Sequence, residues 1–97
     1  MYAVVHVDIE PPQVKVALPL LASYAKHAAH DPAVLHIEIL QQSGATNHFT
    51  LVEVMRSPAA YRQFVDEPYV RQMRTALQPL LGSPFDERLH SAVRLDD

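Results

Sequence analysis

Hydrophobic and polar residues alternate in four stretches of the chain, residues 2–9, 35–40, 48–55 and 87–95. A period of two residues is typical of a β-strand, whose successive side chains point to opposite faces of a sheet. Polar turn-forming residues around Gly44 join the second and third stretches, so these two most simply form a hairpin. The pattern therefore predicts four strands.

Two longer segments have apolar residues at helical spacing instead. In the first, residues 11–30, the predicted buried stripe consists of Val14, Leu18, Leu21, Ala25 and Ala28. Pro19 lies inside this helix and is expected to kink it or to leave its first turns irregular. In the second, residues 57–81, the spacing is interrupted at residues 66–68, so we expect two helical pieces joined by a bend.

The predicted elements follow the order βαββαβ within a single domain, residues 1–97. With right-handed crossovers, this order gives a four-stranded antiparallel sheet with both helical regions on one face. The expected fold class is therefore α+β, with a ferredoxin-like arrangement. The expected strand order in the sheet is 87–95, 2–9, 48–55 and 35–40.

The composition excludes several functional classes. The formal net charge is −3 and the arginines are scattered, so no positive stripe is available for a nucleic-acid backbone. The chain has no cysteine for a disulfide, a thiolate nucleophile or a cysteine zinc site, and its two glycines form no nucleotide-binding loop. No apolar run reaches the ~18 residues of a membrane helix, and the N-terminus does not resemble a signal peptide. We therefore expect a cytoplasmic protein with no membrane or nucleic-acid partner and no nucleotide cofactor.

One face of the predicted sheet is left uncovered by the helices. We expect it to mix apolar with titratable side chains, namely Tyr2, Val4, Leu40, Phe49, Leu51 and Met55 with His6, Glu38, Glu53, Arg88 and His90. A large half-apolar surface favours association, because its burial stabilises by roughly 25 cal/mol per Å². We therefore predict a two-fold homodimer whose sheets face each other.

Glu53 is a carboxylate within the apolar stretch HFTLVEVM, and it has two interpretations. In the first, it is a proton-abstracting base, because enclosed carboxylates and imidazoles shift each other's pKa and can work near neutral pH. In the second, it pairs with Arg88, or with an arginine of a second subunit, and fixes the register between two sheets. The residue pattern alone favours the second interpretation.

The six histidines also raise the question of a metal site. A set of His6, His36, Glu53 and His90 would share one face of the predicted sheet. Adjacent strands do not by themselves provide metal-ligand distances, and we therefore predict no bound metal. His27 and His30 are assigned to a helix C-terminus, where a cation has an ordinary stabilising role.

The aromatic residues of the second helical region are predicted mainly as core. Tyr69 is the exception, because it follows Pro68 at the helix break, and such a break over a sheet commonly marks where a ligand enters. Its phenol is suited to donate a hydrogen bond to a ligand carbonyl.

Three segments taken together, NHFTLVEVM, SPAAYRQFVDEPYVRQMRTAL and GSPFDERLH, resemble the antibiotic biosynthesis monooxygenase family over Val4 to about Val93. That family consists of small dimeric α+β barrels and includes quinol monooxygenases. The resemblance implies a homodimer that oxidises a quinol or polycyclic phenol with dioxygen, without flavin, haem or metal. The sequence departs from the family at Met55, where an aromatic residue is common, and at Phe64 and Tyr69, where a histidine pair is common.

The resemblance also implies a site in which Glu53, with His6 or His90, and Tyr69 handle protons. The side chains expected to bind the aromatic substrate are Phe49, Met55, Tyr61, Phe64 and Arg88. Two alternatives are open on the same scaffold. One is a non-catalytic dimeric barrel that binds a small hydrophobic ligand, and the other is a proton-transfer isomerase, which would turn over substrate anaerobically.

Overall fold

The computed structural model describes residues 1–95 and contains the predicted order of elements. The strands are β1 (Tyr2–Asp8), β2 (Val34–Gln42), β3 (Ala45–Met55) and β4 (Asp86–His90), and the α-helices are α1 (Val14–Ala28), α2 (Pro58–Phe64) and α3 (Pro68–Leu77). Two 3₁₀ turns, η1 (Pro11–Gln13) and η2 (Gln78–Leu80), precede α1 and follow α3. Over the described part of the chain, no helix is long and apolar enough to cross a membrane.

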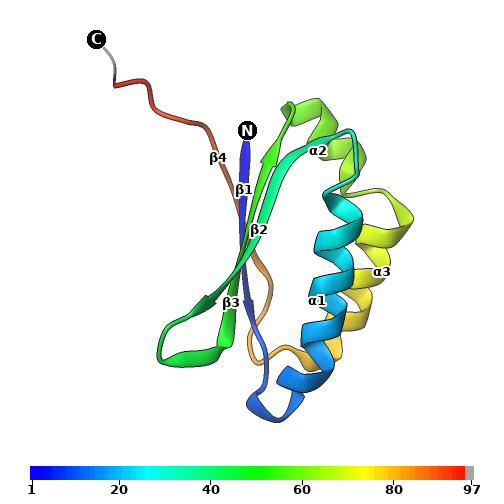
Figure 1. Ribbon diagram of the computed structural model, residues 1–97, viewed down its shortest axis with the longest axis vertical. Coiled ribbons are helices and arrows are strands. Elements are labelled where there is room, and N and C mark those ends of the chain that lie inside the picture. Colours follow the sequence, from blue (N-terminus) through cyan, green and yellow to red (C-terminus); the bar gives the residue numbers. More distant parts are fainter. Residues whose placement is uncertain (96–97) are drawn as a thin grey trace.

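The four strands form one antiparallel sheet in the order β2-β3-β1-β4, and the helices cover one of its faces (Figure 1). The predicted ferredoxin-like α+β fold and its strand order are confirmed. The hydrophobic core lies between the sheet and the helix layer, with Phe64 of α2 fully buried in it. The opposite face of the sheet is open.

The structure corrects the predicted face of β3. In an antiparallel pair, residues directly opposite each other point to the same side of the sheet. Glu53 lies opposite Ala3, which is fully buried under the helices, so the prediction that Glu53 lies on the open face is wrong. The same correction applies to three further residues that were predicted on the open face and lie on the helix-covered face, Phe49, Leu51 and Met55.

The buried stripe of α1 also differs from the predicted one. Its buried residues are Ala17, Leu21, Tyr24 and Ala28. Leu18, predicted to be buried, is 44% exposed, and the helix continues through Pro19 after the irregular turn η1. The rotation of the stripe matters, because it turns the phenol of Tyr24 toward the sheet.

The predicted bend in the second helical region is confirmed. Ser57 caps α2, because its side chain accepts a hydrogen bond of 3.0 Å from the backbone N–H of Ala60. The backbone of Glu67 is extended, and Pro68 then begins α3, where a missing N–H costs nothing. The break therefore lies where the sequence pattern placed it.

β4 is shorter than the predicted strand. Its last residue, His90, pairs with Tyr2, the first residue of β1, so the sheet offers no further partner beyond this point. Residues 91–95 run on without strand pairing and project away from the sheet (Figure 1). Val93 and Leu95, predicted as strand residues, are 77% and 87% exposed.

Candidate functional site

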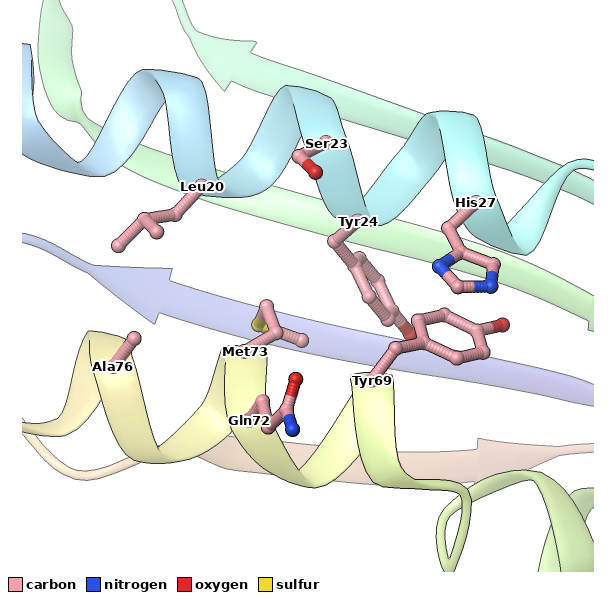
Figure 2. Close-up of a pocket in the computed structure, with 8 residues that line it drawn as sticks. All are labelled: Leu20, Ser23, Tyr24, His27, Tyr69, Gln72, Met73 and Ala76. Carbon is pink, nitrogen blue, oxygen red and sulfur yellow. The ribbon is translucent and has the colours of Figure 1, made fainter.

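A groove of about 390 Å³ runs between α1 and α3 on the helix side of the molecule (Figure 2). It is lined by Leu20, Ser23, Tyr24, His27, Tyr69, Gln72, Met73 and Ala76. Tyr24 and Met73 are buried, while Ser23 and Gln72 are exposed, so the groove has an aromatic and apolar base between polar rims. This composition suits a small, largely apolar ligand with a few polar groups.

Glu53 is connected to this groove through Tyr24. The Tyr24 hydroxyl donates a hydrogen bond to Oε2 of Glu53, whose side chain is 1% exposed. The other carboxyl oxygen, Oε1, is buried and has no hydrogen-bond partner among the residues that the structure describes. A buried polar atom without a partner is uncommon in folded proteins and marks Glu53 as a candidate functional group.

The surroundings of Glu53 favour its protonated form. Burial is the largest effect and raises the pKa of its carboxyl, while the Tyr24 hydrogen bond and the charge of Arg74 act in the opposite direction. Burial, together with the negative charge of Glu53, also raises the pKa of the Tyr24 phenol. Glu53 is therefore a stronger base than an exposed glutamate, and Tyr24 keeps its proton at neutral pH.

Tyr69 and His27 form one end of the groove. Their rings are stacked, with centroids 3.7 Å apart and planes inclined by 9° (Figure 2). The Tyr69 hydroxyl, which was expected to donate to a ligand carbonyl, donates a hydrogen bond of 2.9 Å to Oδ2 of Asp31. The structure thus places Tyr69 at the groove, as expected from its position at the helix break.

A second polar cluster joins α2 and α3 to β4. The Tyr61 hydroxyl and Nη2 of Arg74 both donate to Oε2 of Glu87. Nε of Arg74 is buried and has no hydrogen-bond partner in the described part of the chain, and the guanidinium lies 6.0 Å from the ring centre of Phe85. Tyr61, predicted to bind substrate, belongs to this cluster and not to the lining of the groove.

The structure separates the other predicted site residues. His6 and His90 lie opposite Thr50 and Tyr2 on the open face, so the predicted proximity of Glu53 to these histidines is wrong. Arg88 also lies on the open face, where its Nε donates to Asp86 at 3.0 Å, and the proposed Glu53–Arg88 pair within one chain is excluded. The predicted substrate-binding residues Phe49, Met55 and Phe64 are buried in the core.

The same separation disperses the histidine set considered for a metal. Glu53 lies on one face of the sheet, while His6 and His90 lie on the other. Within residues 1–95, no three histidine, aspartate or glutamate side chains are arranged to hold a metal ion.

A second hollow, of about 380 Å³, lies on the open face beside His6 and His48. Its polar groups are already engaged with one another. Nδ1 of His48 is 3.2 Å from Asp8, the Ser83 hydroxyl donates to Asp8 at 2.8 Å, and His6 is 3.2 Å from the Thr50 hydroxyl. The α1–α3 groove, which leads to a buried carboxyl, is therefore the better candidate site.

Sequence analysis missed Tyr24, His27 and Asp31. Tyr24 had a usable signal, because it continues the spacing of Ala17 and Leu21 on one face of α1, and a phenol in an apolar stripe needs a buried partner. Asp31 had no such signal, since nothing in the sequence pairs it with Tyr69.

Comparisons with known proteins agree with this architecture. The sequence model of the antibiotic biosynthesis monooxygenase family matches residues 1–76. A crystal structure of an antibiotic biosynthesis monooxygenase is similar with a TM-score of 0.92 and 16% identity, covering 96% of this chain and 98% of that one. A proposed antibiotic biosynthesis monooxygenase from Nitrosomonas europaea is similar with a TM-score of 0.90 and 13% identity, covering 97% and 100% of the two chains.

The fold also occurs in a conserved protein from Methanosarcina mazei, with a TM-score of 0.85, 13% identity, and coverage of 90% of this chain and 86% of that one. No curated protein matches the sequence. At these identities the structural likeness establishes the fold, and the function must be argued from the site.

Proposed function

Because the chain belongs to the antibiotic biosynthesis monooxygenase family, we propose that it oxidises a quinol or polycyclic phenol with dioxygen, without an organic cofactor or metal. The observation that carries this proposal is the buried carboxyl of Glu53, which has one unpartnered oxygen and is linked to the groove by Tyr24. The groove would hold the flat substrate between α1 and α3, with the phenol directed at Tyr24.

The proposed chemistry needs a base and exclusion of water rather than an electron carrier. Tyr24 would accept the substrate's phenolic proton while passing its own to Glu53, whose raised pKa suits this task. The resulting phenolate transfers one electron to dioxygen, and the radical pair combines to form a carbon–oxygen bond. Loss of water from the hydroperoxide then gives a quinone, so one oxygen atom enters the product and the other leaves in water.

Oxygen uptake with a reduced naphthoquinol or anthrone tests this proposal. We expect Glu53→Gln to lower kcat/KM by roughly 10²–10⁴-fold, because the base is lost while its shape is kept. Glu10→Gln is the matched control, since Glu10 is an exposed carboxylate beyond the end of β1, outside both the groove lining and the open sheet face, and its removal should leave uptake unchanged. Full activity in Glu53→Gln, or no uptake across a broad panel of phenols, would contradict the proposal.

A second candidate function is ligand binding without turnover. It is favoured by the fact that the Tyr24 and Tyr69 hydroxyls are both already bonded to carboxylates, Glu53 and Asp31. In this case Glu53→Gln would change stability and ligand affinity. The wild-type protein would bind a naphthoquinone but would show no oxygen uptake with the corresponding quinol.

We further propose that the working form is a homodimer with the open sheet faces paired. Tyr2 and Leu40 on this face are 36% and 47% exposed, and Val4, Val52 and Val54 are only partly buried. Covering such a surface stabilises by roughly 25 cal/mol per Å² of apolar area. A second copy offers the same mixed apolar and polar surface, as a two-fold interface requires.

A further inference from the structure

Asp31 is a buried charged residue that the proposed chemistry does not use. It follows α1 in the turn that leads to β2, and only 8% of it is exposed. Its Oδ1 accepts a hydrogen bond of 2.9 Å from the backbone N–H of Ala33, and its Oδ2 accepts one of 2.9 Å from the Tyr69 hydroxyl. The α1–β2 turn therefore fixes the carboxylate of Asp31, and this carboxylate binds Tyr69 of α3.

The residue that it holds shapes the groove. Tyr69 is stacked on His27, and its ring centroid is 6.1 Å from that of Tyr24. The Tyr69 ring also packs edge-on against Phe64, with ring centroids 6.1 Å apart. The hydrogen bond to Asp31 adds to these ring contacts a directional restraint on the hydroxyl end of Tyr69, and so on the orientation of the stacked wall.

Several ionisable groups face Asp31. His27 of α1 and Tyr69 of α3 lie on the groove side, Glu67 in the α2–α3 break hydrogen-bonds to Asp31, and Arg56 after β3 donates to the carbonyl of Pro32 at 2.8 Å. The hydrogen bond with Asp31 raises the pKa of Glu67 to about 7. Burial acts to raise the pKa of Asp31, but the bonds from Glu67, Ala33 and Tyr69 outweigh it and hold that pKa below its usual value.

We propose that Asp31 is the positioning residue of the α1–α3 groove: it fixes Tyr69 flat against His27 and so prepares a wall on which a planar aromatic ligand stacks. The proposal rests on the groove being the ligand site of the proposed function. A fixed wall lowers the entropy lost when the ligand binds, so Asp31 acts on affinity and not on proton transfer.

Calorimetric titration with naphthoquinone, which needs no turnover, tests the positioning role. Tyr69→Phe keeps the ring and removes only the hydroxyl, and Asp31→Asn leaves one carbonyl oxygen for two donors. We expect both variants to weaken binding roughly tenfold, since a hydrogen bond to a charged group is lost. Asp66→Asn is the matched control, because Asp66 is exposed and paired with Arg71. The affinity of this variant for naphthoquinone should equal that of the wild type.

The NMR chemical shifts of the His27 ring protons provide a second readout. A purely structural role of Asp31 would not predict the change in these shifts that is expected here. In the wild type they carry the ring-current shift of a stacked tyrosine, and in Tyr69→Phe and Asp31→Asn they should move toward those of the exposed His30. Unchanged affinity and unchanged His27 shifts in Tyr69→Phe would overturn the proposal, whether or not Asp31→Asn folds.

If naphthoquinone binds and responds to Tyr69→Phe while no phenol supports oxygen uptake, the positioning role stands and the oxygenase falls. If naphthoquinone does not bind while another phenol supports oxygen uptake, the positioning role falls and the oxygenase stands.

Discussion

Tyr24 and Glu53 form a buried pair whose members come from different layers of the molecule, α1 and β3. Placing an ionised carboxylate in the core is unfavourable by several kcal/mol unless it is paired. Glu53 has a neutral hydrogen-bond donor in Tyr24 and only the more distant charge of Arg74 to offset its burial. The pair is therefore a local source of instability, as the proposed catalytic role of Glu53 would entail.

Stability measured against pH should reveal this cost. Burial raises the pKa of Glu53 in the folded protein above its ordinary value, so ionisation of Glu53 costs more in the folded than in the unfolded chain. The stabilising effect of the bound proton is complete below the ordinary pKa and is lost as the pH rises through the raised one. Glu53→Gln, which cannot ionise, should match the wild type at acidic pH and become the more stable protein as the pH rises.

Thermal unfolding at a series of pH values provides the measurement. Glu10→Gln, beyond the end of β1, should follow the wild-type curve throughout. A wild type that gains stability over Glu53→Gln with rising pH would show that Glu53 is ionised and well paired in the fold.

Among the elements, β3 shows what sequence patterns determine and what they leave open. Its alternation predicted a strand, but apolar residues lie on both sides of it, with Leu51 under the helices and Val52 and Val54 on the open face. Parity within one strand does not say which side faces the helices. That choice becomes visible only in the register with β1, where Glu53 lies opposite the buried Ala3.

The elements themselves were predictable because their signals are local. The helix break at Pro68, the cap at Ser57 and the hairpin at Gly44 all depend on residues within a few positions of the feature. The groove is different, because α1 and α3 are far apart in sequence. Of the residues that line the groove, only Tyr69 was predicted as a site residue. The contacts of Tyr24 with Glu53 and of Asp31 with Tyr69 span 29 and 38 residues of sequence.

The β2–β3 hairpin offers a test at the scale of an element. Gly44 has a φ of 81°, which an L side chain rarely adopts, and an added Cβ would meet no atom within 4 Å. Gly44→Ala should therefore cost about 1 kcal/mol of unfolding free energy through backbone strain alone.

Gly82→Ala is the matched control for this substitution. Gly82 has no left-handed φ, and an added Cβ would make only ordinary contacts at 3.7 to 3.8 Å. Urea unfolding should show the difference between the two variants, and equal losses at both glycines would contradict the assigned role of Gly44.

For the molecule as a whole, the sheet divides the chain's functional surfaces. The groove and Glu53 lie on the helix side, whereas His6, Arg88 and His90 lie on the open side that we propose for dimer contact. The sequence pattern assigned the chemistry to the open face, and the sealing of that face by a second copy stays a prediction. The carboxyl is secluded from water by the chain's own helices instead.

Association can be tested at the centre of the open face. Val52 lies on the central strand β3 between Val4 and Glu38 of its neighbours, so Val52→Glu would place a charge in the middle of the proposed interface. We expect this variant to sediment as a single subunit at concentrations where the wild type is a dimer. Val16→Glu, on the exposed side of α1, should remain dimeric, and a monomeric wild type would refute the interface.

β3 carries Glu53 on one side of its pleat and Val52 and Val54 on the other. Under the proposed function and the proposed interface, neighbouring codons would therefore specify two properties that lie on opposite faces of the sheet. Substitution of the even-numbered residues of this strand would then change the assembly without altering the reaction.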